Sequence, residues 1–187
     1  MSLSRTIRPE PPMPAIPPLV AGDRMSRDEF ERRYDAMPGL KKAELIDGVV
    51  YMPSPVRITL HGEPHIFLDT WLGTYRAATP GTRAGTNTTA RLSLDNEPQP
   101  DALLLIDPAC GGQAQINPND YVELAPELVA EVSASTASFD LNSKLDAYCR
   151  NGVREYLVWR VLDRQFDWFA RRGHAFEHLV PGSDGIL

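Results

Sequence analysis

The sequence is short of cysteine, of long apolar runs and of positive charge. Its 187 residues include only two cysteines, Cys110 and Cys149, which are too few for a disulfide framework or a structural zinc site. No apolar run approaches the roughly 20 residues of a membrane span, and the N-terminus lacks the charged and then apolar order of a secretion signal. These absences predict a cytoplasmic protein with reduced thiols and no membrane partner.

The formal net charge of the chain is −6. Proteins that coat nucleic acid without sequence preference neutralise many phosphates with lysine and arginine, so this charge argues against that class. It still leaves room for a local basic groove. An acidic total is also typical of a chain that gathers carboxylates to hold a cation.

Residues 1–24 are predicted to form a flexible arm in front of a single domain, residues 25–187. Such an arm either binds a partner through its prolines or is a plain extension. The remaining length and an apolar content of 42% suit one domain with one core. Six prolines in the arm exclude a helix and favour extended chain: Pro9, Pro11, Pro12, Pro14, Pro17 and Pro18.

The first half of the domain predicts two helices and a hairpin. The stretch "SRDEFERRYDAM" opens with a Ser-x-x-Glu capping box, which predicts a short helix ending near Asp35. In "ELIDGVVYM", apolar residues lie on both sides of Asp47-Gly48, a dipeptide suited to a type I′ hairpin turn. In "HIFLDTWLGTYRAA", apolar residues recur at helical spacing, so a long helix is predicted from near Pro64.

The second half predicts a sheet. We expect strands in "TTARLSL", in residues 102–106 and in "PELVAEVS", followed by a helix over residues 138–152. Three late strands are predicted in "REYLVWRVL", "QFDWFARR" and "AFEHLV". The predicted fold class is therefore α/β, with a mixed β-sheet flanked by helices.

Two acidic residues interrupt the apolar strands. Asp101 immediately precedes residues 102–106, and Glu131 lies inside "LVAEVS". A buried carboxylate must be neutralised, paired or bound to a cation. If the two strands are neighbours, both carboxylates reach one cleft, where two hard oxygen ligands, a main-chain carbonyl and water suit Mg²⁺ or Mn²⁺.

Lys144 adds a possible third part to this site. On an ideal helix it lies about 60° from Leu141, so it flanks the packed face and can lean toward the sheet. An ammonium beside two carboxylates and a metal can orient water or offset charge on a phosphate. Structural interpretations stay open for each residue: Asp101 begins a strand, Glu131 pairs with an arginine such as Arg154, and Lys144 is a solvated helix lysine.

Longer motifs resemble a known family. Pro100-Asp101, Glu131 and a lysine resemble the PD-(D/E)XK nuclease superfamily. "AELIDGVVYMPSP", then His61, "PQPDALLLID" and "APELVAEVSASTASFDLNSKLDAYCRNGVREYLVW" resemble the Uma-two family of restriction-endonuclease-like domains over roughly residues 26–170. The block from Glu131 to Tyr156 is the most specific part of the resemblance.

The resemblance implies a restriction-endonuclease-like core and metal-dependent cleavage of DNA. By resemblance, the metal ligands are Asp101, Glu131 and the carbonyl of Val132, with Glu44 as an upstream acid at the same site. His61 corresponds to a histidine that is common in the family. This residue either donates a proton or contacts the phosphate, or it is structural. The family lysine falls on Lys144.

The sequence departs from the simplest superfamily motif at one position. That motif has lysine two positions after the glutamate, where this chain has Ser133. The lysine role passes to Lys144 only if its helix packs over the strand end. Asp140 is predicted to cap that helix.

The sequence predicts the substrate and the partners only as broad classes. Relatives with this fold frequently pair, so we expect a homodimer that cuts both DNA strands. The alternatives are a catalytically inactive nuclease-fold module for binding or assembly, and a metal hydrolase of RNA or small phosphate esters. Five arginines either contact DNA or are solvated surface charges: Arg57, Arg83, Arg91, Arg150 and Arg154. Four late aromatic residues are expected in the core or in a dimer contact rather than in a platform that stacks on bases: Trp159, Phe166, Trp168 and Phe169.

Overall fold

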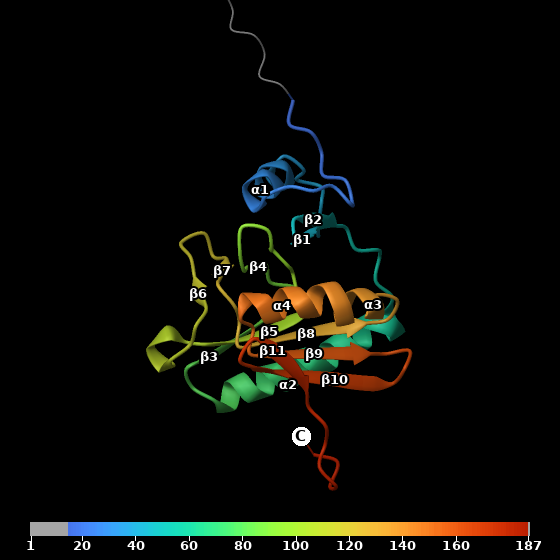
Figure 1. Cartoon of the computed structure of the whole chain (residues 1–187), viewed down its shortest axis with the longest axis vertical. Helices are drawn as coiled ribbons and strands as arrows, with labels where there is room; N and C mark the ends of the chain where they lie inside the picture. The colour runs from blue at the N-terminus through green and yellow to red at the C-terminus, as the bar shows by residue number, and fades with distance from the viewer. Residues whose placement is uncertain (1–14, 187) are drawn as a thin grey trace, which may run out of the picture.

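The computed structural model describes residues 15–186, and its centre is a six-stranded mixed sheet (Figure 1). The strand order is β11-β10-β9-β8-β5-β3. β8 and β9 are parallel, and the other neighbours are antiparallel. The strand bounds are β3 (Thr82–Thr86), β5 (Ala102–Ile106), β8 (Leu128–Ser133), β9 (Glu155–Arg160), β10 (Gln165–Arg172) and β11 (Ala175–His178).

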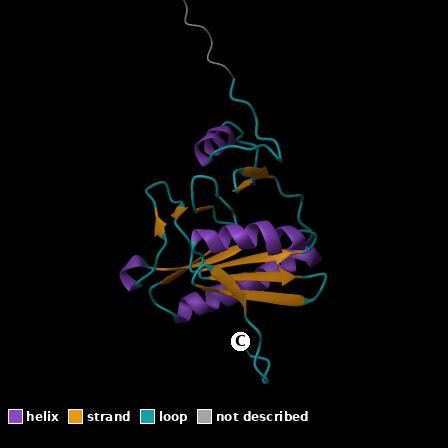
Figure 2. Ribbon diagram, in the orientation of Figure 1, coloured by secondary structure: helices purple, strands orange, loops and turns teal. Residues whose placement is uncertain are grey.

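Helices cover both faces of this sheet (Figure 2). On one face lies α2 (Glu63–Ala78), whose Leu68 and Leu72 pack against β5, β8 and β9. On the other face, α3 (Ala137–Phe139), the π-helical turn η3 (Asp140–Lys144) and α4 (Leu145–Asn151) follow one another without a break. The predicted α/β fold class, a mixed sheet flanked by helices, is confirmed. None of the helices in the described residues is both long and apolar enough to cross a bilayer.

A smaller unit lies on the α4 side of the sheet (Figure 1). It consists of α1 (Arg27–Asp35) and a hairpin of β1 (Glu44–Ile46) and β2 (Val49–Tyr51) around its own apolar cluster. The predicted type I′ turn is confirmed, because Asp47 and Gly48 both have positive φ, 51° and 71°. The predicted capping box is wrong: the Ser26 side chain caps nothing, and Glu29 binds Arg32 and Arg33 instead.

Part of the predicted arm packs on this unit. Leu19 is only 3% exposed, and Gly22 N–H donates a hydrogen bond to the Val50 carbonyl. Four of the six prolines of the arm lie outside the described residues: Pro9, Pro11, Pro12 and Pro14. The boundary of the domain at residue 25 therefore stays a prediction.

The least predictable strands are short or polar. Of the expected strand "TTARLSL", only β4 (Ala90–Arg91) forms, in a small sheet with β7 (Val122–Glu123) and β6 (Gln115–Ile116). The loop before β6 contains the 3₁₀ turn η2 (Pro108–Cys110). β3, with the sequence "TRAGT", was not predicted, because it is largely exposed and has no large apolar residue.

Candidate functional site

Asp101 and Glu131 lie at the same end of two neighbouring strands. β5 and β8 are antiparallel with Ala102 opposite Ala130, so Asp101, directly before β5, comes opposite Glu131. Residues two apart in a strand share a face. Leu103 and Val129 belong to the apolar cluster under α4, so both acids project from that face. The structure thus brings together two carboxylates that are 30 positions apart in the sequence.

Lys144 lies between two of the acids. Its Nζ is 2.8 Å from Glu131 Oε1 and 2.9 Å from Glu44 Oε1, and the Tyr148 hydroxyl donates to Glu131 at 2.9 Å. Lys144 is only 3% exposed, so its interpretation as a solvated helix lysine is wrong. The proposed pairing of Glu131 with Arg154 is also wrong, because Arg154 approaches Glu127 instead.

Asp101 is held from three sides. Its Oδ2 accepts the Val132 N–H at 2.8 Å and lies 3.2 Å from His61 Nε2, while Lys42 Nζ is 3.7 Å from Oδ1. Burial raises the pKa of Asp101, but the hydrogen bond from His61 and the charge of Lys42 outweigh it and lower the pKa to about 2. Asp101 is therefore ionised at every pH of interest.

Glu131 and Lys144 are shifted by the same buried cluster. Burial, reinforced by the carboxylates of Asp101 and Glu44, raises the pKa of Glu131 to about 8 against the attraction of Lys144. Burial lowers the pKa of Lys144, but the surrounding carboxylates outweigh it and hold this pKa above its ordinary value. The ammonium stays charged, and without a further cation Glu131 tends to keep a proton.

Each of the three acids makes its hydrogen bonds and close ion pairs through one oxygen. These oxygens are Asp101 Oδ2, Glu131 Oε1 and Glu44 Oε1, the last also accepting the Gln99 N–H at 2.7 Å. The second oxygen of each acid accepts no hydrogen bond from residues 15–186. The Val132 carbonyl points to the same strand edge as its N–H, and thus toward Asp101. Several hard oxygen donors at one edge fit a divalent cation.

Two π-helical turns flank the cluster. η1 (Ile58–Gly62) carries His61 directly before α2, which begins next to Pro64 as predicted, and η3 carries Lys144. Single π-turns in helices are frequent at functional sites. Asp140 does not cap its helix as predicted: Thr136 is the N-cap residue, and its hydroxyl donates to the buried Asp140 carboxylate at 2.6 Å.

Sequence reasoning missed three residues of this site. Lys42 could have been found from its place two positions before Glu44, on the same side of an extended chain. His65 and Tyr148 follow His61 and Lys144 by four positions, one helical turn. The Tyr148 hydroxyl donates a hydrogen bond to Glu131, a contact that helical spacing alone does not predict.

The candidate DNA-contacting arginines differ in exposure and in their ion pairs. Arg83 and Arg150 pair with Asp107 and Asp47. Arg57 is exposed and directly precedes η1, which makes it the candidate nearest to His61 in the chain. Three of the late aromatic residues are partly buried: Trp159 and Trp168 pack against the α2 cluster and Phe169 against the α4 cluster. Phe166 is 51% exposed and stacks on Trp159.

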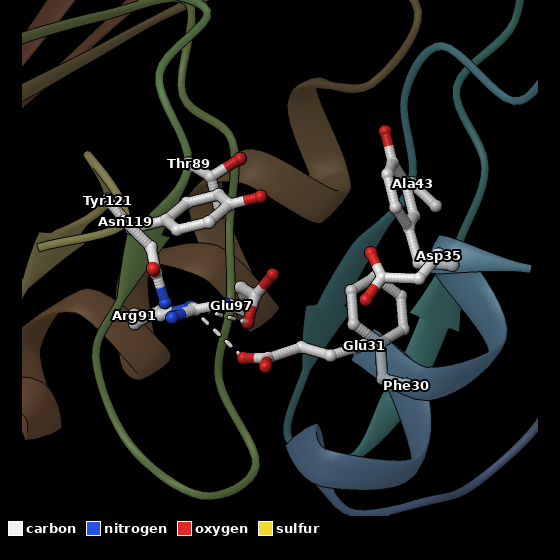
Figure 3. Close-up of a pocket in the computed structure, with 10 residues that line it drawn as sticks. Phe30, Glu31, Asp35, Ala43, Thr89, Arg91, Glu97, Asn119 and Tyr121 are labelled. Carbon is white, nitrogen blue, oxygen red and sulfur yellow. Dashed lines mark ion pairs between the residues drawn. The ribbon is translucent and has the colours of Figure 1, made fainter. Parts of the chain in front are cut away.

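A separate hollow between α1 and β4 takes up Arg91 (Figure 3). The Arg91 guanidinium lies 4.0 Å from the centre of the Tyr121 ring, and its Nε is 3.0 Å from Glu31 and 3.6 Å from Glu97. Its side chain is only 13% exposed. Arg91 therefore stabilises this buried group of acids.

Glu97 should make the stability of the protein depend on pH. Burial, followed by the Glu31 carboxylate, raises its pKa from 4.5 to about 8. Its stabilising contribution is thus complete below pH 4.5 and is lost as the pH rises toward 8. Glu97→Gln should unfold with nearly wild-type stability at low pH but be stabilised by about 1 kcal/mol or more at alkaline pH. Thermal unfolding at both extremes checks this, and a variant less stable than wild type at alkaline pH would contradict it.

Comparisons with known proteins find one matching family model and a solved structure with a similar fold. Residues 27–184 match the Uma2 family, described as "Putative restriction endonuclease". The crystal structure of a putative nuclease belonging to DUF820 from Anabaena variabilis superposes with a TM-score of 0.61 at 15% identity, over 86% of this chain and 90% of that one. No curated protein matches the sequence. The chain therefore belongs to the Uma2 family.

Proposed function

We propose that the protein is a metal-dependent endonuclease that hydrolyses DNA phosphodiester bonds. One observation carries the proposal: three buried acids and a buried lysine meet at one end of β5 and β8, and each acid has an oxygen that accepts no hydrogen bond from residues 15–186. A purely structural cluster would have no need of so many buried charges, because burial of carboxylates is costly.

The residues fit a Mg²⁺ or Mn²⁺ ion. Asp101, Glu131 and the Val132 carbonyl would hold it, with Glu44 contributing directly or through water. The ion, when bound, supplies Lewis acidity that lowers the pKa of water and polarises a phosphoryl oxygen. Lys144 holds the attacking water or the charge that builds on the phosphate, and the strands keep the acids rigidly in place.

Binding of DNA is supported by cations around the cluster. Lys42 is 23% exposed at its side chain and lies beside Asp101, and Arg57 is exposed in the turn before His61. A shallow hollow offers hydroxyl and amide groups that suit a phosphate backbone; it is lined by Tyr51, Ser135, Thr136, Ser138, Phe139, Asn142 and Ser143. It adjoins the cluster, because Tyr51 is the strand partner of Glu44.

The proposal includes a homodimer, which would bring one site to each strand of a duplex. Its support is the outer face of α2, where Ile66 and Phe67 are 59% and 65% exposed. Large exposed apolar residues in a contiguous patch are typical of interaction surfaces. A molar mass in solution of 20.8 kDa, that of one chain, would contradict pairing.

A plasmid-nicking assay tests the proposed activity. Wild-type protein with Mn²⁺ should nick supercoiled DNA, chelation should stop it, and Asp101→Ala should abolish it because that change removes a ligand of the metal. Equal nicking by both proteins would point to a contaminant or to another site. A metal-dependent activity on RNA alone would replace DNA as the substrate, and the absence of any activity together with the absence of metal binding would favour the non-catalytic module.

A further inference from the structure

Three potential metal ligands come together beside the acid cluster. His61, His65 and Asp101 each offer one ligand atom, and these atoms lie within 4.8 Å of one another. They come from three places in the fold: the π-turn η1, the first turn of α2 and the residue before β5. No other trio of histidine, cysteine or acidic side chains in residues 15–186 is as close.

Within this trio, His65 binds the main chain and does not offer a metal ligand. Its Nε2 lies 2.7 Å from the Asp101 carbonyl oxygen and 3.0 Å from the Thr86 hydroxyl. A carbonyl oxygen can only accept a hydrogen bond, so this nitrogen carries a proton and has no lone pair for a metal. His65 therefore holds the main chain of Asp101 and positions its carboxylate.

His61 is free to act as a ligand. Its Nε2 lies 3.2 Å from Asp101 Oδ2. Two ligands that occupy neighbouring positions of an octahedral ion, each at ~2.1 Å, are about 3 Å apart. An ion can thus replace the proton between these two atoms with little movement of either residue. The His61 side chain is 19% exposed, so the position is open to solvent on one side.

We propose that His61 Nε2 is a ligand of the catalytic metal and that the site therefore selects a first-row transition ion such as Mn²⁺ or Co²⁺ over Mg²⁺. The inference rests on the proposed nuclease function. Mg²⁺ prefers oxygen ligands and keeps its water, whereas imidazole nitrogen binds the borderline transition ions well. Acids and a carbonyl alone would give a weaker preference. His61 would then contribute as a ligand and not as a proton donor.

Pulsed electron paramagnetic resonance of bound Mn²⁺ tests this directly in the full chain. Wild-type protein should show ¹⁴N modulation from a coordinated imidazole. The modulation should disappear in His61→Gln and remain in the control His174→Gln, whose residue is exposed. Wild-type Mn²⁺ without nitrogen modulation would overturn the inference, and so would modulation that is kept in His61→Gln.

Calorimetric titration supplies a second readout. Wild-type protein should bind Mn²⁺ at least tenfold more tightly than Mg²⁺, and His61→Gln should lose most of that preference while Mg²⁺ affinity changes little. Equal affinities of the wild type for both ions would overturn the inference and yet leave the nuclease proposal intact, since plasmid nicking tests that separately. If the wild type binds neither ion, both proposals fail.

Discussion

Replacing Lys144 with methionine should lower the rate of DNA cleavage by about 100-fold or more, the usual loss when a group that stabilises transition-state charge is removed. Lys144 is the cation between Glu131 and Glu44, at 2.8 and 2.9 Å. Methionine fills a similar space but removes the positive charge from beside the buried carboxyl groups of Glu131 and Glu44. Breaking a buried ion pair in this way costs about 3–5 kcal/mol, which lowers the melting temperature by roughly 6–20 °C.

Added Mn²⁺ should separate the two effects. The ion neutralises the same carboxylates, so it should raise the melting temperature of Lys144→Met more than that of the wild type, while cleavage stays low. Scanning calorimetry and single-turnover cleavage well below the melting temperature measure both quantities. Lys41→Met, at an exposed lysine, is the control. Wild-type turnover in a folded Lys144→Met protein would remove the lysine from the mechanism.

Glu131→Gln should weaken Mn²⁺ binding at least tenfold and cleavage at least 100-fold without lowering the stability of the metal-free protein. Glutamine keeps an oxygen for the Tyr148 hydroxyl but is a poor ligand for a hard cation. Burial raises the pKa of Glu131 from 4.5 to about 8. The wild type therefore loses stability as the pH rises between these values, and a neutral side chain does not.

The measurements for this variant are a metal titration, a cleavage assay and thermal unfolding at several pH values. The stability of Glu131→Gln relative to the wild type should grow in favour of the variant as the pH rises. Glu177→Gln, at an exposed position on β11, serves as the control. Wild-type affinity of Glu131→Gln for Mn²⁺ would exclude Glu131 as a ligand.

The elements that carry the site could be predicted because their patterns are local. The apolar runs around Glu131 and after Asp101 predict β8 and β5, and helical spacing of apolar residues predicts the helix that carries Lys144. The antiparallel register that sets Asp101 opposite Glu131 joins distant segments. The sequence therefore predicts that the two acids meet only if the two strands are assumed to be neighbours, or if the family resemblance is used.

What could not be predicted depends on tertiary contacts. β3 is strand only because it pairs with β5, since its own residues are polar or small. The π-turns have no sequence signature comparable to a helix cap. The ion pairs that occupy Arg91 and Arg150 form with acids far away in the chain, so charge alone could not identify the arginines that make structural ion pairs.

Anomalous diffraction from crystals of the full chain grown with Mn²⁺ would show whether Asp101 and Glu131, from two separate segments, hold one divalent ion. We expect an anomalous peak within about 2.0–2.6 Å of carboxylate oxygens of both residues, with Lys144 beside it. A Mn²⁺ peak elsewhere in the protein, or none at this edge of the sheet at saturating Mn²⁺, would contradict it.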